Sequence, residues 1–296
     1  LVVVVCLVVL LRKALRHKKH PDDLISPSEV QCIEIIGRGS FGDVWSATWR
    51  GQTIAVKIVS TSGISKNSIV QIRQEAKLMK KLRHPSVLQY FGTATDKDCI
   101  LIAMEYMQEG SVRGLLNRTS FDMTWKLRLS MLIDAACGML YLHSLNPPII
   151  HRDLKSHNLL VNNKWEVKVC DFGLSIGVKQ NEYMQSNILG TLAWIAPEIF
   201  AHAPYNTKVD VYSFGIVMWE VLTRLVPYKG LDRQTIQHKV VVEKARPLVP
   251  PETHAAYRSL MEVCWDENPN LRPDFGTVVT RLRAIRDQND MVDAEW

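Results

Sequence analysis

The chain has 296 residues, of which 47% are hydrophobic, so it is long enough to build two small lobes or one large domain around a packed core. Its formal net charge is +6, and a basic cluster near its start contributes +5 of it: Arg12, Lys13, Arg16, Lys18 and Lys19. Because the remainder is close to neutral and has no basic stripe, the charge does not indicate a nucleic-acid partner.

The chain begins with a wholly apolar run, residues 1–11, which the basic cluster follows directly. This run is too short to cross a bilayer, which takes about 20 residues. Positive charges after an apolar run are typical of a stop-transfer sequence, whereas a signal peptide carries them before the run. Because the first residue is not Met, we expect residues 1–11 to be the last half of a transmembrane helix. The alternative is an ordinary segment buried against the domain.

Residues 12–29 are then expected to form a basic juxtamembrane segment and a linker, with residues 21–28 rich in Pro, Asp and Ser. The basic cluster would lie against the anionic cytosolic leaflet. This predicts a single-pass membrane protein with its folded domain in the cytosol, or otherwise a cytoplasmic protein.

A glycine-rich pattern, G-x-G-x-x-G, precedes Val44 and consists of Gly37, Gly39 and Gly42. Dinucleotide-binding enzymes share this pattern, but there it connects a strand to a helix. Here it lies between two strand-like runs, 30–36 and 43–49. We therefore expect a hairpin tip whose backbone can approach phosphate groups closely.

Another apolar run contains Ala55 and Lys57, and a helical stretch over 65–82 follows it. The apolar face of this helix comprises Ile72, Leu78, Met79 and Leu82. Glu75 belongs to the same stretch. Glu75 is the candidate partner of Lys57, and the alternative is a solvated surface glutamate, because Gln74 and Lys77 are close by.

From residue 107 onward the pattern is mostly helical. Thr124 is predicted to be the N-cap of a long helix that ends near His143. Its apolar positions should face a core: Leu129, Leu132, Ile133, Ala136, Leu140 and Tyr141. A helix over 207–223, with Asp210 near its start, is apolar on nearly all sides and should be buried at the centre of its lobe.

Residues 151–158 read His-Arg-Asp-Leu-Lys-Ser-His-Asn, and Asp171-Phe172-Gly173 follow. These motifs supply a carboxylate base, Asp153, and two oxygen ligands, Asn158 and Asp171. Phosphoryl transfer needs such a set, because one group orients the attacking hydroxyl and two ligands hold Mg²⁺ on a triphosphate.

In this order and spacing, the motifs resemble those of the eukaryotic protein kinases over about residues 30–286. Further matches are Gly190-Thr191, Ala196-Pro197-Glu198, Cys264-Trp265, Asn268-Pro269 and Arg272-Pro273. The resemblance implies an α+β, bilobal fold. Its parts are a small β-rich N-lobe with one main helix (30–104), a hinge (105–107), a large helical C-lobe (108–286) and a C-terminal tail (287–296). It also implies an ion pair between Arg272 and Glu198.

The resemblance also implies the cofactors ATP and Mg²⁺ and a role for each candidate residue. Lys57, held by Glu75, would position the α- and β-phosphates, and Asn158 and Asp171 would hold Mg²⁺. Asp153 would orient the acceptor hydroxyl and take its proton, while Lys155 would offset charge on the transferring group. The remaining nucleotide contacts would come from Gly37, Gly39, Gly42, Val44, Ala55, Glu105, Met107 and Leu160, with Met104 as gatekeeper.

Two features indicate the branch of kinases. Lys155 and Thr191 fit the Ser/Thr kinases, whereas residues 192–198 and the Cys-Trp…Arg-Pro ending look like those of tyrosine kinases. This mixture resembles the tyrosine-kinase-like group, which includes the Raf-like and mixed-lineage kinases. We expect Ser/Thr hydroxyls of protein substrates as acceptors, and dual specificity stays open. The oligomeric state is not indicated.

The main rival from another class is a pseudokinase that serves as a scaffold. None of the expected catalytic residues is replaced, which favours catalysis. An enzyme using ATP works in a reducing cytosol, so we expect the scattered cysteines, which include Cys170 beside Asp171, to be thiols. Arg152 is expected to receive a phosphate on the activation segment, with Ser186 ranked ahead of Ser175 and Tyr183.

Overall fold

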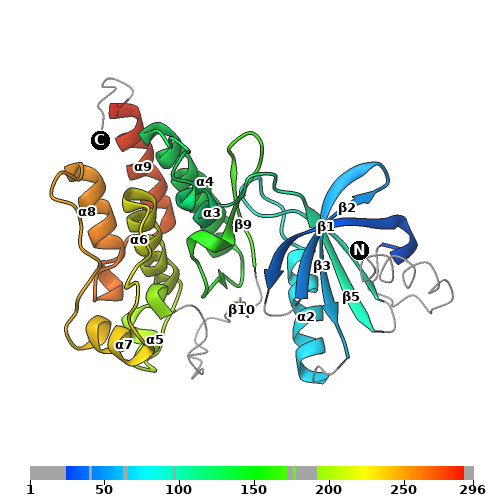
Figure 1. Ribbon diagram of the computed structural model, residues 1–296. Coiled ribbons are helices and arrows are strands. Elements are labelled where there is room, and N and C mark those ends of the chain that lie inside the picture. The colour runs from blue at the N-terminus through cyan, green and yellow to red at the C-terminus, as the bar shows by residue number, and fades with distance from the viewer. Residues whose placement is uncertain are drawn as a thin grey trace. The chain divides into compact units, whose positions relative to one another are not determined.

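The computed structural model describes residues 25–39, 42–62, 66–95, 98–171, 176–177 and 192–289. The described residues form two compact units (Figure 1). The first unit runs to Met107 and the second begins at Gln108, except that Pro85–Val87 belong to the second. Ser86 explains this exception, since its carbonyl accepts a hydrogen bond from Val169 of the second unit at 2.9 Å.

The first unit is built on one antiparallel five-stranded sheet. In spatial order its strands are β1 (Val30–Gly39), β2 (Gly42–Trp49), β3 (Gln52–Ser60), β5 (Cys99–Glu105) and β4 (Tyr90–Thr95). Ile54 and Val56 alternate along β3 on the fully buried side, where they pack with Leu101 and Ala103 of β5. This alternation buries one face of the sheet.

The expected glycine hairpin and the expected helix are both present. β1 and β2 pair up to Gly39 opposite Gly42, so the pattern turns from strand to strand. Helix α2 (Lys66–Met79) contacts β4 and buries Ile72 and Met79. The dinucleotide-binding alternative is therefore wrong for this loop.

The end of the predicted linker differs from its prediction. A short 3₁₀ turn, η1 (Pro27–Glu29), leads into β1, and Ile25 before it is only 2% exposed. Ile25 packs into the core under the sheet and its amide donates to the carbonyl of Thr93 at 3.2 Å. The folded unit thus begins at least five residues before Val30, because the apolar side chain of Ile25 is buried in the core although its neighbours in sequence are polar.

The second unit is mainly helical (Figure 1). Its helices are α3 (Val112–Asn117), α4 (Trp125–Ser144), α5 (Pro197–Phe200), α6 (Lys208–Thr223), α7 (Arg233–Val241), α8 (Ala255–Cys264) and α9 (Phe275–Asn289). Its short strands are β6 (Gly110–Ser111), β7 (Ile149–Ile150), β8 (Leu159–Val161), β9 (Val167–Val169) and β10 (Ile176–Gly177). β6, β8 and β9 form one small sheet, and β7 pairs with β10. The predicted α+β class is confirmed.

Helix α4 confirms the predicted N-cap but corrects one core position. The Thr124 hydroxyl accepts a hydrogen bond from the amide of Leu127 at 3.3 Å. Leu140, which was expected in the core, is 38% exposed. It lies beside Gly276 at the start of α9, and a glycine has no side chain to cover it.

Helix α6 is the centre of the second unit, as its composition predicts. Every residue from Val209 to Val221 is buried. Two of these buried residues are acidic, Asp210 and Glu220. Since a buried carboxylate needs partners that compensate its lost hydration, both point to polar contacts that cross the apolar core.

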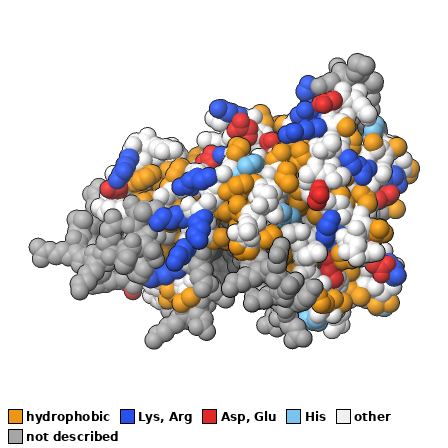
Figure 2. All heavy atoms as spheres, turned by 180° about the vertical axis from the view of Figure 1, so that it is seen from behind, with side chains coloured by type: hydrophobic (Ala, Val, Ile, Leu, Met, Phe, Trp, Pro, Cys, Tyr) orange, Lys and Arg blue, Asp and Glu red, His pale blue; other side chains and the backbone are white. Residues whose placement is uncertain are grey.

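The surface agrees with a nearly neutral domain. On the face drawn in Figure 2, Lys, Arg, Asp and Glu side chains are interspersed over the second unit. Among the described residues, no cysteine forms a disulfide. The described helices include none that is long and apolar enough to span a membrane. The predicted apolar run and basic cluster, residues 1–19, lie outside the described residues.

Candidate active site

The candidate catalytic loop follows β7 and ends in a 3₁₀ turn, η2 (Ser156–Asn158), that leads into β8. Lys155 Nζ lies 2.8 Å from Asp153 Oδ2. The side-chain nitrogen of Asn158, Nδ2, donates to the backbone carbonyl of Asp153 at 2.8 Å and to Asp153 Oδ2 at 3.1 Å. The structure thus brings together three of the predicted residues, with a cation and an amide both aimed at one carboxylate.

The predicted metal ligands have suitable chemistry. Because the side-chain nitrogen of Asn158 donates to Asp153, the side-chain oxygen of Asn158 is the atom that could bind a cation. The backbone carbonyl of Asn158 accepts a hydrogen bond from the backbone amide of Cys170 at 2.9 Å, which fixes the chain directly before Asp171. Asp171 is exposed, with a φ of 64°. Carboxylate and amide oxygens fit Mg²⁺, which usually binds few protein groups and keeps waters and phosphate oxygens as other ligands.

No group of three or more His, Cys, Asp or Glu side chains suited to a metal occurs in the part of the chain that the structure describes.

Asp210 of α6 holds the backbone of the catalytic loop. Its Oδ1 accepts from the amide of Arg152 and its Oδ2 from the amide of His151, both at 2.9 Å. Arg152 has a φ of 65°, a left-handed conformation that costs free energy in a residue other than glycine. The two hydrogen bonds stabilise this strained turn.

The charge of Asp210 is maintained by its neighbours. Burial by itself would raise the pKa of Asp210, but the hydrogen bonds from His143 and from the backbone amide of Arg152 help to hold that pKa below its usual range. His143 Nε2 donates to Asp210 Oδ2 at 2.8 Å. The sequence marked Asp210 only as the start of a helix, and a carboxylate within an otherwise apolar helix is the feature that could have revealed this role.

His151 connects the loop to the segment that carries Asp171. It is fully buried, and its Nε2 donates to the carbonyl of Cys170 at 2.9 Å. Its Nδ1 accepts from the amide of Asp153 at 3.3 Å. Since a carbonyl only accepts, Nε2 carries the proton and Nδ1 does not. This tautomer ties the backbones of Asp153 and Cys170 to one rigid ring.

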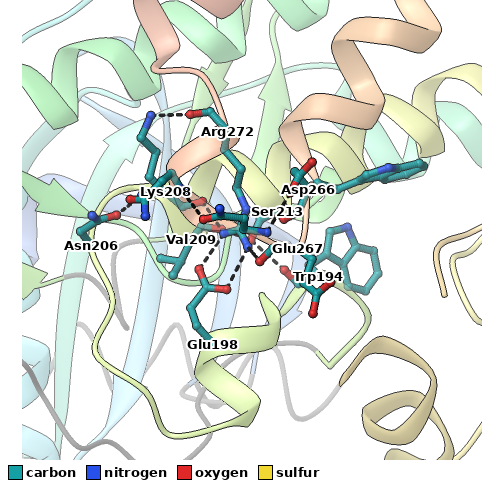
Figure 3. Close-up of polar contacts among 12 residues, drawn as sticks. Trp194, Glu198, Asn206, Lys208, Val209, Ser213, Asp266, Glu267 and Arg272 are labelled. Carbon is teal, nitrogen blue, oxygen red and sulfur yellow. Dashed lines mark hydrogen bonds and ion pairs between the residues drawn. The ribbon is translucent and has the colours of Figure 1, made fainter. Parts of the chain in front are cut away.

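The predicted ion pair between Arg272 and Glu198 is present (Figure 3). Its two contacts are 2.6 Å and 2.9 Å long and form a bidentate fork. Arg272 also donates to the backbone carbonyls of Asp266, Lys208 and Glu267. The buried guanidinium thereby joins the start of α5 to the segment between α8 and α9.

The candidate nucleotide residues of the first unit lie on its sheet. Val44 pairs with Lys57, and Ala55 pairs with Met104, across β2, β3 and β5. Gly42 has a φ of 144°, and a Cβ there would overlap the carbonyl of Ile58. Only glycine suits that position, as the resemblance implies for a loop that comes close to phosphates.

Glu105 and Met107 belong to the predicted hinge, and Glu75 belongs to α2. The Glu105 amide donates to the carbonyl of Gln89 at 2.9 Å, and the contact of the Glu105 backbone with adenine stays a prediction. Met107 is the last residue of the first unit. Glu75 lies in α2, but its side chain is outside the described residues, so its pairing with Lys57 stays a prediction.

Of the second-unit candidates, Leu160 lies in β8, where it pairs with Lys168 of β9. Several predictions fall outside the described residues: Phe172, Gly173, Ser175, Tyr183, Ser186, Gly190 and Thr191. The described geometry is that of a loop in which a carboxylate, a lysine and an amide lie together, a set of groups that suits phosphoryl transfer.

Comparison with known proteins gives the family. A family model described as protein tyrosine and serine/threonine kinase matches residues 30–282. The chain therefore belongs to the protein kinases, a family that uses ATP and Mg²⁺. The resemblance inferred from the motifs is confirmed.

The similar proteins have kinase names. The probable serine/threonine-protein kinase drkC of Dictyostelium discoideum is 42% identical over 264 residues, covering 88% of this chain and 35% of that protein. The serine/threonine-protein kinase CTR1 of Arabidopsis thaliana is 39% identical over 268 residues, covering 89% and 32%. The dual specificity protein kinase shkD of Dictyostelium discoideum is 39% identical over 272 residues, covering 91% and 36%. The chain spans about a third of the length of these relatives, and their names agree with a tyrosine-kinase-like kinase.

Proposed function

We propose that this chain is an ATP-dependent protein kinase that transfers the γ-phosphate of ATP to Ser and Thr hydroxyls of protein substrates. The observation that carries the proposal is the carboxylate of Asp153, which both Lys155 and Asn158 contact. The names of the relatives support Ser and Thr as acceptors.

In this proposal Asp153 orients the acceptor hydroxyl and takes its proton. Lys155, 2.8 Å from the same carboxylate, reaches the oxygens of the transferring group and offsets their negative charge. Asn158 and Asp171 would hold Mg²⁺, which would neutralise phosphate charge when bound. Because the transition state of phosphoryl transfer is loose, these residues act mainly by positioning and electrostatics.

The direct test is an assay with radiolabelled ATP and a generic protein substrate, followed by phosphoamino-acid analysis. We expect label on Ser and Thr that depends on Mg²⁺. Label on Tyr alone, or none above that of a catalytic-loop variant, would overturn the proposal. The second outcome would favour the pseudokinase alternative.

Dual specificity is a second candidate, favoured by the relative that is named a dual specificity protein kinase. Residues 192–198, Leu-Ala-Trp-Ile-Ala-Pro-Glu, also look like those of tyrosine kinases. Label on Tyr in addition to Ser and Thr in the same assay would support it.

The pairing of Lys57 with Glu75 gives a prediction for the nucleotide site. Lys57→Met should strongly reduce phosphoryl transfer by misplacing the α- and β-phosphates, and Glu75→Gln should do so more mildly. If both act as one pair, their effects on kcat/KM should not add in the double variant. Strict additivity of the two effects would contradict a contact between Lys57 and Glu75. The control is Lys77→Met, a change of an exposed lysine on the same helix.

Activation by phosphorylation gives a further prediction. We propose that Arg152 receives a phosphate on the activation segment, with Ser186 the first-ranked acceptor. Arg152 Nη1 donates to the Tyr205 hydroxyl at 3.4 Å. Arg152 also lines a small pocket together with Ile195 and Ala196. A phosphate there would gain charge-assisted hydrogen bonds. Mass spectrometry after incubation with ATP should find phosphate between Asp171 and Glu198, and full activity of protein unmodified in that segment would refute the proposal.

We also propose that the basic cluster attracts this chain to anionic membranes. Each basic residue near such a surface contributes about 1 kcal/mol, reduced by salt screening. Binding to vesicles with anionic lipid should exceed binding to neutral vesicles and should fall with salt. Replacing all five basic residues of the cluster by Gln should abolish the difference, and binding indifferent to lipid charge and salt would contradict this proposal.

The apolar run, residues 1–11, is proposed to strengthen this membrane association. Deleting residues 1–20 separates the two interpretations of the run. A membrane segment predicts unchanged thermal stability and better solubility, whereas a segment packed on the domain predicts a clear fall in melting temperature.

A further inference from the structure

Residues 25–29 form a short strap that precedes β1 and that the catalytic proposal does not use. The match to the kinase family model begins only at residue 30. Ile25, at one end of the strap, is buried, and its amide donates to the carbonyl of Thr93 on β4. Glu29, at the other end, closes the turn η1, because its amide donates to the carbonyl of Ser26 at 2.9 Å. The strap therefore belongs to the fold of the first unit.

The strap covers a hydrophobic cluster on one face of the sheet. Ile25 packs there with residues from all five strands: Val30, Ala47, Ile54, Val56, Ala94, Leu101 and Ala103. Because side chains alternate between the two faces along a strand, Ala55 and Lys57 lie on the opposite face from Ile54 and Val56. Ala55 and Lys57 are nucleotide candidates, so the strap supports the sheet from behind the proposed nucleotide site.

Glu29 connects the strap to the turn between β2 and β3. Its Oε2 accepts hydrogen bonds from Trp49 Nε1 at 2.9 Å and from Arg50 Nε at 3.1 Å, and its Oε1 accepts from Arg50 Nη2 at 3.4 Å. The Arg50 guanidinium also lies over the Trp49 ring, 5.0 Å from the ring centre. The Trp49 ring in turn lies 5.9 Å from the ring of Phe91 on β4. We call Glu29, Trp49 and Arg50 the latch.

The backbone of Arg50 is strained, which gives the latch a reason beyond the turn itself. Arg50 and Gly51 connect β2 to β3 with φ angles of 49° and 80°. A two-residue hairpin turn with positive φ at both positions favours Asn-Gly, and a side chain such as that of Arg is disfavoured there. An exposed ion pair contributes little stability. The guanidinium that reaches both oxygens of Glu29 therefore indicates a positioning role for this arginine.

Strand β1 connects the latch to the glycine loop. Val30 follows Glu29 directly and pairs with Trp49, and the same ladder continues to Gly39 opposite Gly42. The ladder shifts its register at two points on the way. Because such bulges disrupt pairing locally, the position of the glycine loop depends on how well the base of β1 is fixed.

We propose that Glu29 is a positioning residue for the nucleotide: by closing the latch it fixes the base of β1, and so places the glycine loop for ATP. When the latch is open, the base of β1 loses this support and ATP binds less tightly. A displacement of the chain before Ile25 would then act on the nucleotide site from the opposite face of the sheet. The inference rests on the proposed kinase function and names a residue that acts through others.

Two variants open the latch from opposite sides. Glu29→Gln removes the carboxylate, and Arg50→Asn removes the guanidinium but places a residue that suits the turn. The melting temperature of Arg50→Asn should change little, because relief of the strained turn offsets the lost ion pair. For each variant we expect the Kd for ATP with Mg²⁺ to rise about fivefold, the lower end of typical coupling between two sites. The kcat at saturating ATP should stay within about twofold of the wild type.

The double variant should bind ATP about as well as the worse single variant, because either change already opens the latch.

Hydrogen exchange supplies a readout that a merely structural role would not move. If the closed latch favours ATP, then bound ATP must favour the closed latch by the same factor. Exchange of the backbone amides of Ile25 and Glu29 should therefore slow by up to about fivefold when ATP is added to the wild type. In Arg50→Asn the same amides should not respond to ATP.

Glu34→Gln is the matched control for the loss of a charge. Glu34 is exposed on β1 and lies closer along the strand to the glycine loop than Glu29 does. Within the described part of the chain its side chain makes no hydrogen bond or ion pair. An effect of negative charge alone on the phosphates of ATP would appear more strongly at Glu34. We expect the Kd for ATP of Glu34→Gln to equal that of the wild type.

The outcomes are distinct. A raised Kd for ATP in Glu29→Gln and Arg50→Asn but not in Glu34→Gln, with strap amides that ATP protects in the wild type, supports the inference. An unchanged Kd in either latch variant, an equal rise in Glu34→Gln, or strap exchange that is indifferent to ATP overturns it. If one latch variant fails to fold, as judged by its melting temperature, the other decides. A wild-type chain that binds ATP but phosphorylates no peptide refutes the proposed function instead.

Discussion

Replacing Asp153 by Asn should lower kcat for phosphoryl transfer by about 10²–10⁴-fold, the range typical for loss of a general base. Asn keeps the size of the side chain and one oxygen, but it cannot take the proton of the acceptor hydroxyl. It also removes the charge that Lys155 faces at 2.8 Å, so the lysine should lose its fixed position. Steady-state kinetics with a peptide substrate measure the effect.

The fold and ATP binding should survive this change, because Asp153 is only partly buried and its backbone contacts remain. A nucleotide-binding measurement should therefore give a Kd for ATP close to that of the wild type. Asp122→Asn is the control, since Asp122 is an exposed aspartate elsewhere in the same unit. Activity of Asp153→Asn within a factor of three of the wild type would rule out the assigned role.

The sequence predicts best what depends on residues close together in the chain. Asp153, Lys155 and Asn158 lie within one short loop, so their motif implied a shared site that the hydrogen bonds now describe. The Thr124 cap and the buried helix α6 follow from local rules of the same kind.

The family resemblance implied one distant contact, the pair of Arg272 and Glu198, but other residues that act through distant partners were missed. The Asp210 carboxylate accepts hydrogen bonds from the backbone amides of His151 and Arg152, which precede it by almost 60 residues. No local sequence pattern predicts this contact. Glu220 similarly joins Ser156 and Trp194. Helical periodicity likewise could not show that the neighbour of Leu140 would be a glycine. In each case the three-dimensional neighbour decides, and the sequence shows only an acidic or apolar residue.

Removing the Glu198 carboxylate should cause the largest loss of stability among the changes considered for the second unit. Arg272 is completely buried at its side chain, and Glu198 is 9% exposed. Glu198→Ala would leave a buried guanidinium without its counter-charge, which typically costs about 3–5 kcal/mol. For a domain of this size each kcal/mol lowers the melting temperature by roughly 2–4 °C, so we expect a fall of roughly 6–20 °C in a thermal scan.

An exposed ion pair supplies the control for this prediction. Lys239 and Glu243 lie 3.2 Å apart on the surface of α7 and the turn after it, and Glu243→Ala should cost at most about 1 kcal/mol. If the loss at Glu198 comes from an unpaired charge, then Glu198→Ala combined with Arg272→Met should be more stable than Glu198→Ala alone, because the second change removes the buried cation. A double variant that is less stable by the full sum of both single effects would show that the backbone contacts of Arg272, and not its charge pairing, hold α5 in place.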